Sequence, residues 1–180
     1  MRQSTPISRL VRTVPSILAD MERQKIQASV LETRMEVIMP FIREQLDAGG
    51  KVRFSPYGIS MLPMLRQGID TVTLSPVPER LKKYDLPVYR RKSGQYVMHR
   101  VVAVKEDHYV CLGDNTLKFE HIYPEQMIGV VSAFKRGSKR IEVDNPGYQL
   151  YCRLWRPTRP LRLLIYQIKR IAKKVLGILR

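Results

Sequence analysis

Three short segments of this 180-residue chain carry residue types that could do chemistry together. The first, residues 55–65, places Ser60 in a turn between Gly58 and Pro63. Because glycine permits a tight or left-handed backbone, such a turn can expose one hydroxyl and direct backbone amides at the same point. Most serines in Gly/Pro turns only form the turn, so this segment alone does not define a site.

The second segment, residues 96–102, carries a histidine among apolar residues. Period-2 alternation puts His99 on the same strand face as Val97 and Val101. A lone histidine there is more often a hydrogen-bonded core residue, yet histidine is also the usual group that takes a proton from serine near neutral pH. The third segment, residues 111–115, is a strand that ends in a turn carrying Asp114, and it also fits an ordinary Asp/Asn turn.

The elements that must position these segments are predicted to be mostly β. Between residues 51 and 143 the chain is rich in Val, Tyr and Ile, and short alternating runs are separated by turn residues. The connections are too short for crossover helices, which favours an antiparallel sheet. The predicted strands are 51–55, 71–74, 86–90, 95–104, 109–112, 128–135 and 140–143.

Helices are expected on both sides of this β-region. Apolar residues at helical spacing predict a helix over about 21–48, ended by Gly49 and Gly50 and kinked or restarted at Pro40. Downstream, a short helix is predicted over 146–156 and a basic amphipathic helix over 161–179. The expected organisation is an N-terminal segment with a helix (1–50), a β-domain (51–143) and a basic helical tail (144–180).

Charge is concentrated in that tail. The chain has 32 basic and 16 acidic residues, a net charge of +16, and no acidic residue after Asp144. Such a balance predicts an anionic partner: phospholipid headgroups, nucleic acid or an acidic peptide. The few aromatics of the tail and the missing helix-turn-helix pattern argue against nucleic acid. The 161–179 helix fits peripheral contact with an anionic membrane, and it equally fits packing on the β-domain.

Neither a membrane span nor a signal peptide is expected. Apolar stretches are broken by charge before they reach about 20 residues, and no apolar block of signal-peptide length follows the N-terminal arginines. Only two cysteines, Cys111 and Cys152, are present, which is compatible with a reducing compartment. We therefore expect a protein that is cytoplasmic or peripheral at the cytoplasmic membrane.

Taken together, the three segments resemble the signal peptidase I superfamily, which includes the self-cleaving SOS-type repressors. The resemblance covers about residues 52–134 and implies a coiled, mostly antiparallel β-fold with a serine endopeptidase site at one edge. Most bacterial members have a lysine where this chain has His99; the archaeal and endoplasmic-reticulum branch uses a Ser–His pair instead. The matching motifs are Gly-x-Ser-Met-x-Pro at 58–63, apolar-His-Arg-Val-Val at 97–102, Gly-Asp-Asn at 113–115 and Ile-Gly-Val-Val at 128–131.

The resemblance assigns roles residue by residue. Ser60 matches the nucleophile, and its backbone amide matches a donor of the oxyanion hole. His99 matches the general base, and Asp114 matches the aspartate of the Gly-Asp-Asn turn. The histidine branch has a further aspartate six positions later, where this chain has Glu120, so either Asp114 or Glu120 could orient the histidine. Some bacterial relatives add a hydroxyl two positions before the nucleophile, and here that position is Gly58.

The implied substrate is a leader or signal peptide, or another precursor protein, bound in extended form along a sheet edge with small residues before the cut. No metal or cofactor is expected, because the histidines and cysteines lack ligand spacing. Lys105 is a weaker candidate for the base, and His121, next to Glu120, is not expected to take part. The alternative function is a catalytically degenerate peptidase-fold module that binds a membrane or an acidic partner through the basic tail.

Overall fold

The computed structural model describes residues 35–155, 157, 158, 160, 161, 164, 167, 168, 171 and 172. The chain divides into two units, residues 1–40 and 41–180. Residues 35–40 of the first unit and 41–47 of the second are helical; the part of the predicted helix before residue 35 lies outside the described residues. As predicted, the helix ends at a glycine pair: Gly49 has φ +79°, and the amides of Gly49 and Gly50 donate to carbonyls of the last turn.

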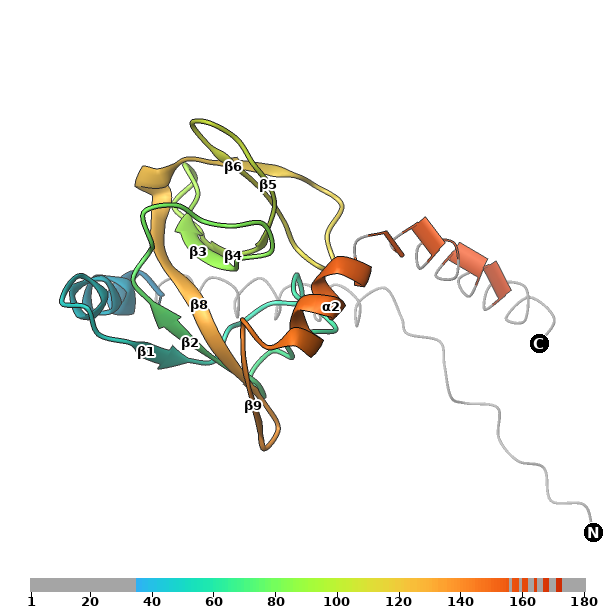
Figure 1. The fold of residues 1–180 in the computed structure, drawn as a ribbon, viewed down its shortest axis with the longest axis horizontal. Coiled ribbons are helices and arrows are strands. Elements are labelled where there is room, and N and C mark those ends of the chain that lie inside the picture. The colour runs from blue at the N-terminus through green and yellow to red at the C-terminus, as the bar shows by residue number, and fades with distance from the viewer. Residues whose placement is uncertain are drawn as a thin grey trace, which may run out of the picture. The chain divides into compact units, whose positions relative to one another are not determined.

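A six-stranded antiparallel sheet forms the larger part of the second unit (Figure 1). Its longest strand, β8, pairs with three neighbours and so holds the sheet together. Gly129 of β8 allows the helix to approach, because a Cβ there would lie 2.7 Å from Cδ1 of Leu46. The strand order is β1 (Val52–Phe54), β2 (Thr71–Ser75), β8 (Met127–Arg136), β3 (Pro87–Arg90) and β4 (Tyr96–Met98), with β9 (Lys139–Glu142) paired to β8.

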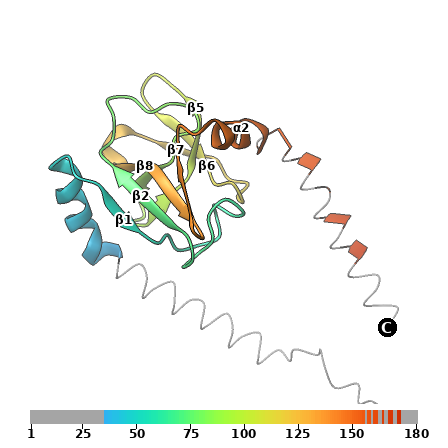
Figure 2. The same cartoon turned by 60° about the horizontal axis from the view of Figure 1, so that its bottom comes forward.

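A second, three-stranded antiparallel sheet follows the order β5 (Arg100–Val104), β6 (Tyr109–Leu112) and β7 (Glu120–Ile122). A short 3₁₀ turn, Pro124–Gln126, leads from β7 into β8. In Figures 1 and 2 the β5–β6 hairpin lies at the end of the β-structure away from β1 and β2. The prediction of a mostly β, antiparallel protein with an N-terminal and a C-terminal helix is therefore confirmed.

Two details of the strand prediction are wrong. The run 95–104 was predicted as one strand, but it forms β4 and β5, which belong to different sheets and are separated by His99. The strand β7 was not predicted, because it has only three residues and two of them, Glu120 and His121, are polar. The other predicted strands agree with the structure to within one or two residues.

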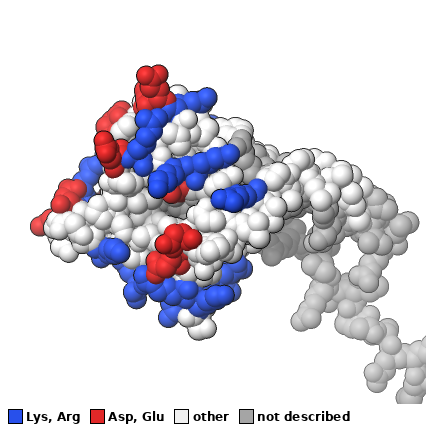
Figure 3. All heavy atoms as spheres, viewed as in Figure 1, with Lys and Arg blue, Asp and Glu red and all other residues white. Residues whose placement is uncertain are grey.

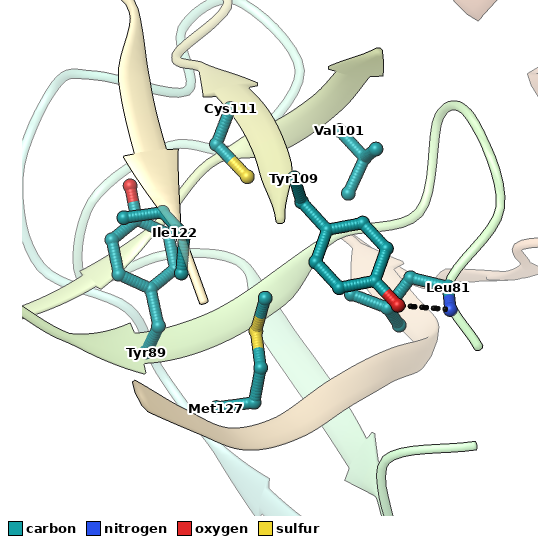
Figure 4. Packing of buried hydrophobic residues seen from close by; sticks show 7 residues of the cluster. All are labelled: Leu81, Tyr89, Val101, Tyr109, Cys111, Ile122 and Met127. Atoms are coloured by element: carbon teal, nitrogen blue, oxygen red, sulfur yellow. Dashed lines mark hydrogen bonds between the residues drawn. The ribbon is translucent and has the colours of Figure 1, made fainter. Parts of the chain in front are cut away.

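Buried side chains from both sheets form one core cluster (Figure 4). Burying an aliphatic or aromatic side chain of this size contributes about 1.5–3 kcal/mol, so the cluster ties the two sheets into one body. A hydrogen bond from the Leu81 amide to the Tyr109 hydroxyl crosses it at 3.2 Å. The cluster consists of Leu81, Tyr89, Val101, Tyr109, Cys111, Ile122 and Met127.

The helix α2 (Pro146–Trp155) follows β9 and confirms the helix predicted over 146–156. Asn145 caps it, because its side-chain oxygen accepts hydrogen bonds from the amides of Gly147 and Tyr148 at 3.0 and 3.2 Å. Tyr148 and Cys152 are the buried residues of the helix. They form the face that packs toward the β-structure.

Charged side chains are unevenly spread over the face drawn in Figure 3. Lys and Arg gather toward its lower end, where the β8–β9 hairpin lies in Figure 1, and Asp and Glu are scattered. The exposed basic residues of that hairpin are Lys135, Arg136, Lys139 and Arg140. Among the described residues, no helix has both the length and the apolar character needed to cross a bilayer.

Candidate active site

Ser60 lies in the turn-rich connection between β1 and β2, as the sequence predicted. Gly58 has φ +103°, a left-handed conformation that strains any residue with a side chain. Its amide donates to the side-chain oxygen of Gln67 at 3.0 Å, which holds the start and the end of the connection together. The turn therefore has a fixed path two residues before the serine.

The Gly-Asp-Asn turn is bonded directly to this serine turn. The backbone amide of Asn115 donates to the Ser60 carbonyl at 2.8 Å, and the Asn115 side chain donates to the Ile59 carbonyl at 3.1 Å. These residues are more than fifty positions apart in the sequence. Two of the three segments singled out from the sequence thus meet.

Gly113 brings the third segment to the same place. A Cβ atom added at Gly113 would lie 2.8 Å from the Ser60 carbonyl oxygen and 2.9 Å from Nε2 of His99. Both distances are too short for a real Cβ contact, so only glycine fits between the serine turn and the imidazole. Ser60 and His99 therefore border the same glycine.

The hydrogen bond between the Ser60 hydroxyl and His99 is not formed. Within the described part of the chain, the Ser60 hydroxyl, the Ser60 amide and Nε2 of His99 are without a hydrogen-bond partner. Ser60 is partly exposed, whereas the His99 side chain is 3% exposed. Ser60 is therefore in partial contact with solvent, while the imidazole is almost fully buried.

The other ring nitrogen of His99 faces polar groups. Its Nδ1 lies 3.1 Å from the Tyr89 hydroxyl and 3.5 Å from a carboxylate oxygen of Glu120. Burial lowers the pKa of His99 below its usual 6.5, and this effect outweighs the nearby negative charge of Glu120, which raises it. The imidazole is consequently neutral at pH 7, as a general base must be.

Glu120 is held by three hydrogen-bond donors. The Arg91 Nε donates to one carboxylate oxygen at 2.9 Å, Arg91 Nη2 donates to the other, and the Tyr89 hydroxyl donates at 2.9 Å. Burial alone would raise the pKa of Glu120, but the hydrogen bonds from Arg91 and Tyr89 outweigh it and the pKa is lowered. Glu120 is therefore a charged carboxylate on the Nδ1 side of His99.

Asp114, the other candidate for orienting His99, forms an ion pair with Arg100. Arg100 donates to both carboxylate oxygens, from Nε at 2.9 Å and from Nη2 at 2.7 Å, and the two side chains are only 4% and 2% exposed. Tyr151 and Trp155 of α2 also donate to Asp114, the first to its carboxylate and the second to its carbonyl. Of the two carboxylates, Glu120 faces His99 and Asp114 faces the arginine that docks α2.

The roles of Tyr89 and Arg91 were not evident from the sequence. Tyr89 was predicted only as part of a strand, and Arg91 follows that strand. Alternation along β3 could have marked Tyr89 as buried, but nothing in the sequence connects either residue with Glu120. That contact depends on how the two sheets meet.

The remaining candidates lie elsewhere. Lys105 is exposed. It directly follows β5, whereas His99 directly precedes that strand. Nδ1 of His121 lies 3.0 Å from Nε2 of His108, whose other nitrogen lies 2.7 Å from Asp107. No group of three or more His, Cys, Asp or Glu side chains in the described residues could hold a metal ion.

Comparisons with family models and curated proteins identify no relative of this chain. No family model matches the chain, and no curated protein matches it. The chemistry of the site therefore follows from its own geometry. A partly exposed alcohol and a buried neutral imidazole, backed by a clamped carboxylate, are the groups that nucleophilic acyl transfer requires.

Proposed function

We propose that this protein is a serine endopeptidase of the signal-peptidase-like type, with the coiled antiparallel β-fold of that superfamily, that cleaves a leader or signal peptide. One observation carries the proposal. His99 has a carboxylate behind Nδ1, and its Nε2 and Ser60 border the same glycine, Gly113. Three sequence motifs that are distant along the chain meet at this point.

In the proposed reaction, Nε2 of His99 takes the proton of the Ser60 hydroxyl as the oxygen attacks the scissile carbonyl carbon. The tetrahedral intermediate collapses, the C–N bond breaks, and His99 returns the proton to the leaving amine. Water then attacks the acyl-enzyme in the same way and releases Ser60. The Ser60–His99 hydrogen bond has to form on substrate binding, as catalytic hydrogen bonds often do when they are long in the free enzyme.

The amide of Ser60 is the proposed oxyanion donor, because it is unpaired in the described part of the chain. The amide of Gly58 is unavailable, since it already donates to Gln67. In enzymes with two oxyanion donors, removing one of them lowers the rate by about 10²–10³-fold. We therefore expect a slow enzyme.

Within the described residues, two strands at the ends of the larger sheet are placed to receive an extended substrate. β1 and β4 are at the two ends of the strand path in the larger sheet. β1 leads into the Ser60 turn, and β4 ends one residue before His99. A peptide that pairs with one of these edges passes the site in extended form, and the resemblance adds that small residues precede the cut.

A peptide library incubated with the full-length protein and read by mass spectrometry tests the proposal. We expect cleavage by the wild type and none by Ser60→Ala or His99→Ala. Matched controls are Ser55→Ala, in the same connection, and His121→Ala, an exposed histidine; both should cleave at the wild-type rate. Cleavage by Ser60→Ala at the wild-type rate would remove the mechanism.

The degenerate binding module remains a second candidate because of one observation on the tail. Leu161, Leu164, Ile168 and Ile171 are helical and 54–60% exposed, so these four described residues present apolar side chains to solvent. Residues 145–180 contain nine basic residues and no acidic one. An apolar stripe in a basic segment fits the headgroup layer of an anionic membrane, where each basic residue contributes about 1 kcal/mol.

Vesicle sedimentation distinguishes the two candidates and shows whether they coexist. We expect the full chain to bind vesicles containing phosphatidylglycerol, and to bind more weakly at high salt or after deletion of residues 158–180. An Ile168→Gln variant should weaken binding without changing the net charge. Equal binding by the deleted and full chains would eliminate the membrane role, and vesicle binding without any peptide cleavage would favour the degenerate module.

A further inference from the structure

Tyr89 is a core residue whose ring packs among apolar side chains, while its hydroxyl bonds to polar groups. It lies on β3 between β4 and β8, is 0% exposed, and its ring is part of the core cluster. In Figure 4 the ring lies beside Ile122 and its hydroxyl points away from Met127. Because the ring is packed on all sides, the position of this hydroxyl is fixed by the fold.

The hydroxyl is bonded to two groups at once, Oε2 of Glu120 at 2.9 Å and Nδ1 of His99 at 3.1 Å. A phenol has one proton to donate. A carboxylate that is charged only accepts hydrogen bonds, so the Tyr89 proton goes to Glu120. The contact with His99 must then be donated by the imidazole, which puts the histidine's own proton on Nδ1.

This order of donors sets the tautomer of the catalytic base. With its proton on Nδ1, neutral His99 carries a lone pair on Nε2, the nitrogen that borders Gly113 and the Ser60 turn. The direct distance from Nδ1 to Glu120 is 3.5 Å, longer than an ordinary hydrogen bond of this type. The carboxylate therefore acts on the imidazole chiefly through the tyrosine hydroxyl.

Arg91 completes the arrangement. It donates to both oxygens of Glu120 and is itself bonded to the side chain of Gln95 at 2.9 Å. A bidentate arginine fixes the plane of a carboxylate. It leaves one oxygen of Glu120 directed at the Tyr89 hydroxyl.

We propose that Tyr89 is a positioning residue that relays Glu120 to His99, so that the site works as Ser60–His99–Tyr89–Glu120. The inference rests on the proposed peptidase function. Tyr89 does not give up its proton in the reaction; its hydroxyl accepts from the imidazole and donates to the carboxylate throughout. Burial and Glu120 raise the pKa of Tyr89, which keeps the phenol protonated.

Substitution by phenylalanine tests the relay, and the core supplies a matched control. Tyr89→Phe should lower kcat about 10²-fold with KM unchanged, less than the ~10⁴-fold cost of a wrong tautomer in a Ser–His–Asp triad, because Glu120 stays nearby. Tyr109→Phe removes a hydroxyl of the same cluster that bonds the Leu81 amide and does not touch His99. It should keep the wild-type kcat. Equal losses in the two variants would show a packing effect and overturn the relay.

A measurement without substrate separates this inference from the proposed function. Two-bond ¹H–¹⁵N NMR spectra of the full-length protein report which nitrogen of His99 is protonated. We expect the Nδ1–H form in the wild type and in Tyr109→Phe, and a mixture of both tautomers in Tyr89→Phe. An Nε2–H imidazole in the wild type, or an unchanged spectrum in Tyr89→Phe, would overturn the relay whether or not the protein cleaves peptides.

Discussion

The ionisation of His99 is set by opposing effects that substitution can separate. Burial lowers the pKa of His99, and the negative charge of Glu120 raises it. The acid limb of the kcat/KM profile should therefore have its midpoint below pH 6.5, the usual value for histidine. Glu120→Gln removes the group that raises the pKa, so the midpoint should move to still lower pH. The plateau should fall at the same time, by about 10–10³-fold, because the imidazolium of the transition state loses its carboxylate.

Asp107→Asn is the control for that experiment. Asp107 is an exposed carboxylate whose side chain contacts His108, and within the described residues it has no hydrogen bond or ion pair to His99 or Glu120. Its removal should leave both the midpoint and the plateau unchanged. An acid limb that stays at the wild-type pH or moves to higher pH in Glu120→Gln would mean that Glu120 does not raise the pKa of the base.

The sequence singled out Ser60 and His99 as candidates but could not choose between Asp114 and Glu120. The reason is that His99 and Arg100 are adjacent in the chain but contact different carboxylates. His99 faces Glu120, and Arg100 forms an ion pair with Asp114. Spacing along the chain cannot tell which neighbour a carboxylate meets. Only the pairing of β6 with both β5 and β7 decides it.

Gly113 provides a residue-scale test of the site without altering a functional group. A methyl group at this position would overlap the Ser60 carbonyl and Nε2 of His99. Gly113→Ala should therefore abolish most of the activity, because the serine turn or the imidazole must move. Gly147→Ala, in the first turn of α2, meets only the end of the Asn145 side chain at 3.2 Å and should behave as wild type in the same assay. A fully active Gly113→Ala would show that Ser60 and His99 do not work across this glycine.

At the scale of elements, alternation predicted the strands well but not where the chain changes sheets. Val97 and Val101 both pack in or against the core, as alternation requires, so the run 95–104 looks continuous in the sequence. The change at His99 comes from β4 pairing with β3 while β5 pairs with β6. These are contacts between distant segments, which a local pattern does not contain.

The Arg100–Asp114 pair links α2 to the β-structure. Arg100 also donates to the Tyr148 hydroxyl at 2.8 Å and to Sγ of Cys152 at 2.9 Å, both on α2. Asp114→Asn leaves this buried arginine without a counter-charge, so it should cost about 3–5 kcal/mol in the free energy of unfolding. Urea denaturation measures the loss. Emission from Trp155, the single tryptophan, should shift to the red as α2 loosens.

Two variants check that interpretation. Tyr151→Phe removes only a 3.3 Å hydrogen bond to Asp114 and should cost at most about 1 kcal/mol. The double variant Arg100→Met/Asp114→Leu removes both charges and should recover much of the stability, because an apolar pair needs no counter-charge. If Asp114→Asn unfolds at the wild-type urea concentration, the pair does not hold the helix.

For the whole molecule, the shifted groups predict how stability depends on pH. His99, Asp70 and Glu120 all have a lowered pKa in the folded protein, so each binds protons more readily when unfolded. Stability should therefore fall as the pH drops below 6.5, first through His99 and then, below about pH 4.5, through the two carboxylates. Asp85, whose pKa burial raises, opposes the loss of stability that the two carboxylates cause.

The first of these two losses can be assigned to a single residue. In His99→Gln the decrease of Tm between pH 7 and pH 5.5 should disappear, while the decrease below pH 4.5 should remain, because Asp70 still accepts hydrogen bonds from Arg66. The matched control, His121→Gln, removes an exposed histidine and should keep both decreases. A wild-type Tm that is constant from pH 7 to pH 5.5 would contradict the buried, neutral state of His99, on which its action as a base depends. Thermal unfolding thus tests the ionisation of the proposed catalytic group independently of any substrate.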